Sequence, residues 1–140
     1  EAGSGQAIKL MEDYSFQLKD DRGQVFSFRL VGLAPLPPQN PASKTEREFR
    51  QEIQSRLSGL ILSNQVRVAV THLSESRAGL GVAYVGETNV NAALVEAGLG
   101  KVKREFLSGL TRKEQFALIR AESKAREKKA GLWQEPAETN

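Results

Sequence analysis

Short runs in which apolar and polar residues alternate occupy the first third of the chain and return after residue 64. Residues 14–18 and 25–30 have this period of two, and the Asp- and Gly-containing turn between them predicts a β-hairpin. Residues 7–11, 65–70 and 82–85 predict three further strands. One helical pattern separates the two groups of strands and two more follow, an order that leaves no room for repeated βαβ crossovers. The sequence therefore predicts an α+β domain, a small five-stranded antiparallel β-barrel with three helices packed outside it.

The first two helices are predicted from their caps and stops. Ser43 or Thr45 is expected to cap the first helix, which runs to about residue 58 and ends at Gly59. Asn91 is expected to cap the second helix, over residues 92–97, with Gly98 as its stop. The proline-rich stretch 33–41 before the first helix predicts a loop, because proline cannot donate a ladder hydrogen bond.

The third helix is the longest. Thr111 and Glu114 have the spacing of a capping box at its start, and Gly131 is expected to end it. Trp133 is expected to fold back onto this helix, and Tyr84 is expected to pack in the barrel core. The apolar stripe predicted to face the barrel comprises Phe116, Leu118, Ile119, Ala121 and Ala125.

Length and composition indicate one domain. A chain of 140 residues can bury a single core, and the absence of cysteine excludes disulfides and cysteine-ligated zinc. We expect a flexible leader over residues 1–6, a folded domain over 7–134 and a polar tail over 135–140. No apolar run approaches the roughly 18 residues of a membrane span, so we expect no membrane partner. We also expect a monomer. The composition suits both a secreted or periplasmic protein whose signal has been removed and an intracellular one.

Positive charge is concentrated in the last third of the chain. Residues 101–129 hold ten Lys and Arg against four Glu, a net charge of +6, while the rest of the chain carries −3 of the total +3. Such asymmetry points to a polyanionic partner. The alternative is a solvated helix face with charge pairs such as Glu122 with Arg126.

Three motifs, in matching order, resemble the staphylococcal-nuclease-like (thermonuclease-like) family over about residues 8–133. They are FRLVGL at 28–33, the block AYVGETNVNAALVEAGLGKV at 83–102, and AESKA at 121–125 followed by GLW at 131–133. The resemblance implies an OB-fold barrel with three helices and a calcium-dependent site that cleaves phosphodiesters.

At the positions that the family uses for catalysis, the resemblance retains only Arg29. Ala34 stands where the family has a calcium-binding aspartate, Pro37 where it has the glutamate base, Tyr14 at a further ligand position and Leu80 at the second arginine. We therefore expect no catalytic residues, no metal site and no cofactor, and a groove lined by Leu36, Leu80 and Tyr14. Glu12 and Asp13 would restore a metal site only if the turn that carries them differed from the family's.

The residues expected to contact nucleic acid are Arg29, Arg77, Lys101, Lys103, Arg104 and Phe106. Arg29 is interpreted either as a phosphate-binding arginine or as a strand arginine paired with a carboxylate. Phe106 is expected in the core under the third helix, with base stacking as the alternative. His72, the sole histidine, is expected at a strand end on the surface.

The sequence is consistent with three alternative functions. The first is a catalytically degenerate binding module that holds single-stranded nucleic acid weakly and without sequence preference. The second is a scaffold that binds a protein partner through the emptied groove. The third is an altered metal-dependent nuclease or phosphodiesterase that uses Glu12 or Asp13.

Overall fold

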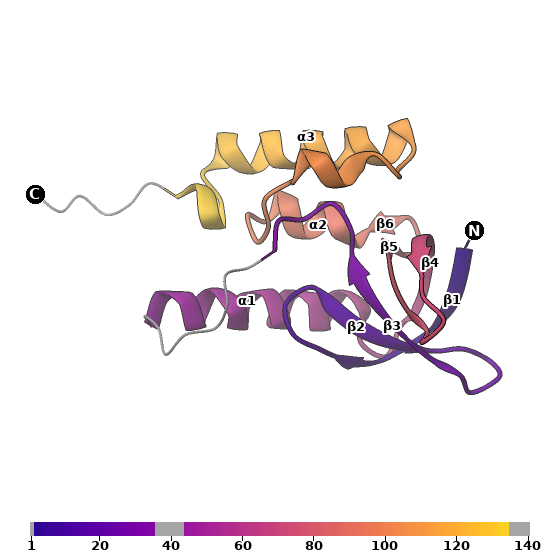
Figure 1. Cartoon of the computed structure of the whole chain (residues 1–140). Helices are drawn as coiled ribbons and strands as arrows, with labels where there is room; N and C mark the ends of the chain where they lie inside the picture. The colour runs from indigo at the N-terminus through magenta and orange to yellow at the C-terminus, as the bar shows by residue number, and fades with distance from the viewer. Residues whose placement is uncertain (1, 36–43, 135–140) are drawn as a thin grey trace, which may run out of the picture.

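The computed structural model describes residues 2–35 and 44–134. The described chain runs through three strands, a helix, three more strands and two further helices, and a short 3₁₀ helix lies on either side of the last one (Figure 1). The strands are β1 (Ala2–Leu10), β2 (Ser15–Lys19), β3 (Val25–Leu30), β4 (Gln65–Leu73), β5 (Ala78–Val85) and β6 (Thr88–Asn89). The helices are α1 (Lys44–Ile61), α2 (Val90–Glu96), η1 (Arg104–Leu107), α3 (Arg112–Lys128) and η2 (Gly131–Trp133).

Strands β1 to β5 form a closed barrel. The strand order is β3-β2-β1-β4-β5-β6, and β3 also pairs with β5 in parallel, which joins the two sides of the sheet. The expectation of a purely antiparallel barrel is wrong in this one pairing. Because five strands that alternate in direction are an odd number, the first and last must run the same way when they meet. The predicted five-stranded barrel with three helices is otherwise confirmed.

Residues 2–6 of the segment expected as a leader form the first half of strand β1. β1 begins at Ala2 and pairs with β4 from Ala2–Ala69 to Gln6–Gln65, while its second half pairs with β2. A Cβ atom on Gly5 would lie 2.6 Å from the carbonyl oxygen of Lys19. Glycine, which suggests flexibility in the sequence, here permits a close approach between two strands. The expected tail at 135–140 lies outside the described residues.

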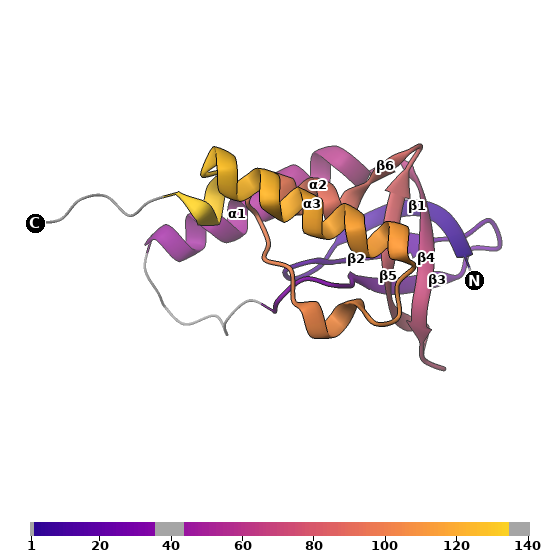
Figure 2. The same ribbon diagram turned by 90° about the horizontal axis from the view of Figure 1, so that it is seen from above.

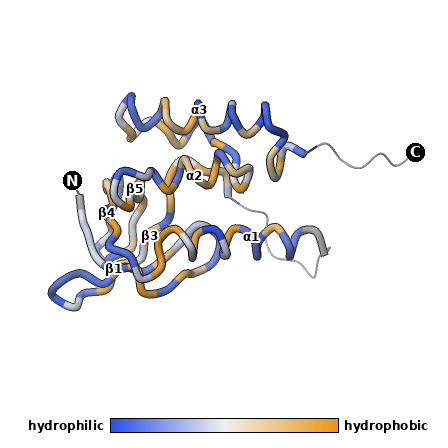
Figure 3. Tube along the Cα trace, turned by 180° about the vertical axis from the view of Figure 1, so that it is seen from behind, coloured by the Kyte–Doolittle hydropathy of each residue, from blue (hydrophilic) through white to orange (hydrophobic). Residues whose placement is uncertain are grey.

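The barrel core follows the period-two alternation of the strands. Alternate residues of β2 and β4 are buried, and Val82 of β5 joins them. In Figure 3 hydrophobic residues gather on β3 and α2, whereas the outer turns of α3 are hydrophilic. The largest fully buried side chains of the strands are Phe16, Val66, Val68 and Val82.

The helices differ from prediction mainly at their ends. α1 continues past Gly59 to Ile61, because Ile61 is fully buried and extends the apolar row of Ile53 and Leu57. Ser43 and the proline-rich stretch from residue 36 lie outside the described residues. The capping box of Thr111 and Glu114 at the start of α3 is confirmed.

Two further helix boundaries are corrections. Asn89 caps α2 by accepting a hydrogen bond from the amide of Ala92, so Asn91 is not the cap. α3 ends at Lys128, and its C-cap Lys129, two residues before Gly131, adopts the left-handed conformation. Of the stripe predicted on α3, Leu118, Ala121 and Ala125 are buried, but Phe116 is 68% exposed.

α3 lies across α2, and the segment after α3 returns to the end of α2 (Figures 1 and 2). The amide of Leu132 donates to the carbonyl of Gly98 at 2.8 Å, and a Cβ atom on Gly98 would lie 2.1 Å from the oxygen of Ala130. Trp133 is only partly buried, between Lys101 and Arg126, and is not the core residue expected. Among the described residues, no helix is both long and apolar enough to span a membrane.

Candidate functional site

A cavity of about 610 Å³ opens between the wall of the barrel and η1. β3 and its continuation form one side, the ends of β4 and β5 a second, and η1 with the following loop the third. Most of the lining is apolar, with a few polar groups at its rim. The lining residues are Tyr14, Arg29, Leu30, Val31, Gly32, Leu33, Pro35, Thr71, His72, Leu80, Glu105, Phe106, Ser108 and Gly109.

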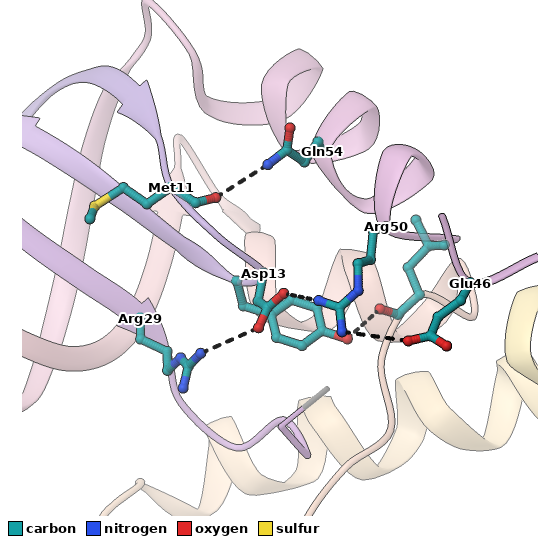
Figure 4. Close-up of polar contacts among 8 residues, drawn as sticks. Met11, Asp13, Arg29, Glu46, Arg50 and Gln54 are labelled. Atoms are coloured by element: carbon teal, nitrogen blue, oxygen red, sulfur yellow. Dashed lines mark hydrogen bonds and ion pairs between the residues drawn. The ribbon is translucent and has the colours of Figure 1, made fainter. Parts of the chain in front are cut away.

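Arg29 is the cation that lines this cavity. It lies on β3 directly opposite Leu80 of β5, so the parallel pairing sets the two side by side. Its side chain is 44% exposed, and its Nη2 lies 3.7 Å from Oδ2 of Asp13 (Figure 4). Arg29 thus lines the cavity and has the carboxylate partner of the second interpretation, whereas its binding of phosphate stays a prediction.

Asp13 also binds a second arginine. Its Oδ1 accepts a hydrogen bond from Nη1 of Arg50 on α1, and these two side chains are 18% and 15% exposed. Figure 4 shows Asp13 between the two guanidinium groups, with Glu46 beside Arg50. Asp13 has a φ of 59°, a left-handed conformation that Asp tolerates better than most residues. Sequence reasoning missed Arg50, because nothing in its spacing on α1 marks it as a neighbour of the β1–β2 turn.

The side chain of Tyr14 lines the cavity, and its hydroxyl makes a hydrogen bond that stabilises the fold. The hydroxyl donates to the carbonyl of Leu99 at 2.8 Å, and the side chain is almost fully buried. Burial, with a further contribution from the charge of Asp13, raises the pKa of Tyr14 well above that of a free tyrosine. Tyr14 therefore stays a neutral phenol, and its proton is already directed at a backbone carbonyl.

Phe106 is at the rim of the cavity and not in the core, so that expectation is wrong. It is 44% exposed, whereas the next residue, Leu107, is buried. In a 3₁₀ helix successive side chains point about a third of a turn apart, so Leu107 and Leu110 pack inward and leave Phe106 outside. The sequence KREFL offers both aromatic and aliphatic candidates for the core, and its alternation does not choose between them.

The other predicted nucleic-acid contacts are spread around the molecule. Lys101 lies over the ring of Trp133, with Nζ 5.2 Å from the centroid. Lys103 pairs with Glu105 at 3.7 Å, and Glu105 lines the cavity. Arg104 is exposed, and Arg77 has a φ of 63° in the turn before β5. Of the six predicted contacts, only Arg29 and Phe106 line the cavity.

His72 is placed as expected, whereas Tyr84 departs from expectation. His72 is at the end of β4, as predicted, and it lines the cavity. Tyr84 is partly buried: its hydroxyl donates to Oε2 of Glu114 at 3.3 Å, and the guanidinium of Arg67 lies 4.4 Å from its ring centroid. Burial first, and then the charge of Glu114, raise the pKa of Tyr84.

The positions singled out by the family resemblance surround the same cavity where the structure describes them. Tyr14 and Leu80 line it, and Ala34 is held beside it by a hydrogen bond from its amide to the carbonyl of Lys101 at 2.8 Å. Leu36 and Pro37 lie outside the described residues. Within residues 2–35 and 44–134, no group of three or more His, Cys, Asp or Glu side chains is arranged to hold a metal ion.

A buried asparagine fixes the far wall of the cavity. Asn91, the one buried polar residue in the described part of the chain, accepts from the amide of Ala83 at 3.0 Å. Its amide group donates to the carbonyls of Val31 at 2.9 Å and Gly81 at 3.3 Å. These bonds tie the start of α2 to β5 and to the segment after β3, and so hold the cavity wall in place.

Comparison with known proteins identifies the family of the chain. No curated protein matches the chain. A sequence model of the family described as staphylococcal nuclease homologue matches residues 27–135, which cover β3 to η2. Because that match spans well over half of the chain and the fold is a five-stranded barrel with three helices, the chain belongs to the staphylococcal nuclease homologue family.

Proposed function

We propose that this domain binds single-stranded nucleic acid in the barrel cavity and does not cleave it. The observation that carries the proposal is that Arg29 and the half-exposed ring of Phe106 line the same cavity of about 610 Å³. Proteins that hold single strands without sequence preference combine a cation for the backbone with an aromatic ring on which a base stacks. Each of these two groups is accessible to a ligand from solvent.

Binding without cleavage is supported by the side chains that surround Arg29. A calcium ion takes six to eight oxygen ligands, commonly with carboxylates among them. The neighbours of Arg29 include Leu80, which has no donor atom, and Tyr14, whose hydroxyl is bound to Leu99. Asp13 has both oxygens directed at arginines, so its charge is already balanced. These residues do not fit the calcium site that the family implies.

The affinity is expected to be weak and salt-dependent. Asp13 offsets the charge of Arg29, and Glu105 offsets that of Lys103. A strand in the cavity therefore meets little uncompensated charge apart from exposed Arg104. Each phosphate neutralised contributes a slope of about −0.7 to the dependence of log K on log salt for single strands.

A second candidate, a protein ligand, is favoured by the apolar character of the lining. Five apolar residues contribute to the wall, and such a cavity accepts an apolar side chain as readily as a base: they are Leu30, Val31, Leu33, Pro35 and Leu80. The two candidates differ in salt dependence, because an apolar peptide gains little from counterion release.

The test is binding of a fluorescein-labelled oligothymidine, followed by fluorescence anisotropy at about 50 and 200 mM salt. Phe106→Ala should weaken binding by about 5- to 150-fold, the range of a lost base stack of about 1–3 kcal/mol. Phe116→Ala, which removes an exposed ring outside the cavity, is the matched control and should leave affinity unchanged.

Arg29→Ala should lower the salt slope by about 0.7, one phosphate's share. Arg22→Ala in the exposed β2–β3 turn is its control and should lower the slope less. Equal losses for Phe106→Ala and Phe116→Ala would contradict the proposed site. Chelator-sensitive cleavage of the oligonucleotide in calcium, lost in Arg29→Ala, would instead establish a hydrolase.

A further inference from the structure

A second recess lies between α2 and α3, and it shares no residue with the cavity described above. Its volume is about 340 Å³, and its floor is formed by the methyl groups of Ala92, Ala117 and Ala121. We call it the α2–α3 groove, defined by those three residues together with Glu96, Lys113, Phe116, Arg120 and Lys124.

Phe116 is the most exposed large hydrophobic side chain in the described part of the chain, at 68%. It is on the rim of the α2–α3 groove, on a helix whose buried residues Leu118 and Ala125 do not line the groove. Covering a phenylalanine that is exposed to water at the edge of an apolar recess removes apolar surface from water, which stabilises the complex with whatever covers it. The fold itself does not cover it.

Three cations accompany the ring. Lys113, Arg120 and Lys124 line the groove, and within residues 2–35 and 44–134 none of them has a carboxylate oxygen within 4.0 Å. Other cations of α3 do have such partners, since Arg126 pairs with Glu122 and Lys128 with Glu96. The rise of an α-helix places Arg120 about 6 Å from Lys124 and about 10 Å from Lys113 along the axis.

We propose that the α2–α3 groove binds an acidic amphipathic helix of a partner protein. The apolar row of such a helix fits a recess between two helices that has a methyl-lined floor, with Phe116 as the covered anchor. Carboxylates spaced four and seven residues apart on the partner match the spacing of Lys124, Arg120 and Lys113.

Charge and chemistry argue against the other occupants. A second copy of this chain would set the same three cations against one another, which costs free energy. The phosphates of a nucleic acid could pair with the cations, but the polar edges of its bases would lie against alanine methyl groups without hydrogen-bond partners. An acidic helix satisfies both the charge and the apolar floor.

The test uses the whole chain labelled with ¹⁵N and a synthetic peptide of about 18 residues, long enough to be partly helical alone. The peptide carries leucines every third and fourth position and glutamates on both flanks. Titration should shift the amide signals of residues 92–96 and 113–124. Phe116→Ser should weaken binding by about tenfold or more, and Ile8→Ser, at an exposed apolar position outside both the groove and the cavity, should not change it.

A charge reversal gives a gain of binding that a damaged fold cannot mimic. The variant Lys113→Glu, Arg120→Glu, Lys124→Glu should lose the acidic peptide and bind the same peptide with lysine in place of glutamate. The proposal is overturned if neither peptide shifts these amides. It is equally overturned if oligothymidine, phosphatidylserine vesicles or self-association at higher protein concentration shifts them more strongly than the acidic peptide does.

Discussion

Asp13 competes with any incoming phosphate for Arg29, and its neutralisation should therefore strengthen nucleic-acid binding. Nη2 of Arg29 lies 3.7 Å from Asp13, and Arg29 is 44% exposed. An ion pair as exposed as this contributes at most about 1 kcal/mol. Since 1.4 kcal/mol is a factor of ten, Asp13→Asn should raise the affinity for oligothymidine by at most about fivefold.

The same substitution should lower stability through Arg50. Asp13 and Arg50 are mostly buried and share a charge-assisted hydrogen bond, a class that contributes about 1.5–3 kcal/mol. Asparagine keeps one acceptor oxygen and tolerates the positive φ of residue 13, so part of this contribution remains. We expect the free energy of unfolding in urea to fall by about 1–2 kcal/mol.

Glu12→Gln is the matched control. Glu12 is exposed, carries the same charge one residue earlier and has no ion-pair partner among the described residues. It should change oligothymidine affinity only through the net charge of the protein. If Asp13→Asn strengthens binding no more than Glu12→Gln does, as measured by anisotropy at about 50 mM salt, Asp13 does not compete for Arg29.

Three further predictions concern the framework of the site. Asn91→Ala leaves one amide and two carbonyls without their buried partner and should cost about 3–5 kcal/mol of unfolding free energy, measured in urea. Gly98→Ala should destabilise by more than about 2 kcal/mol, because φ is +76° and Cβ would meet Ala130; a variant with a native melting temperature would contradict the close packing. Burial raises the pKa of Tyr14 in the folded state, so its contribution to stability is complete below about pH 10 and declines above it as the unfolded tyrosine ionises. Tyr14→Phe should flatten that alkaline decline in urea titrations at several pH values.

Sequence patterns predicted the elements better than their ends. Alternation in β2 and β4 follows directly from one face being buried, so these strands were predictable. Asparagine before an apolar run commonly caps a helix, so the sequence predicts a cap at Asn91, but the neighbouring Asn89 has that role. The choice between two asparagines depends on what surrounds each in the fold, and Asn91 is surrounded by backbone groups of β5.

The candidate site was predictable only in part. Arg29 could be placed because its strand is regular and its neighbours carry a family motif. Phe106 and Arg50 could not, since η1 has too few residues to show a period, and Arg50 meets Asp13 across a long sequence separation. Pairings between distant segments depend on the docking of α1 against the barrel, which no local pattern encodes.

The parallel pairing of β3 with β5 closes the barrel beside the cavity, so the cavity is complete only when this pairing has formed. All of α1 and β4 lies between these two strands, so their meeting requires the closure of a long loop. Folding that depends on such non-local contacts is slow compared with helix and hairpin formation. A nascent or partly folded chain can hold the β1–β3 meander and still lack the juxtaposition of Arg29 and Leu80. Only molecules with a closed barrel would therefore bind a ligand at this cavity. The bound ligand would in turn stabilise the β3–β5 pairing against opening.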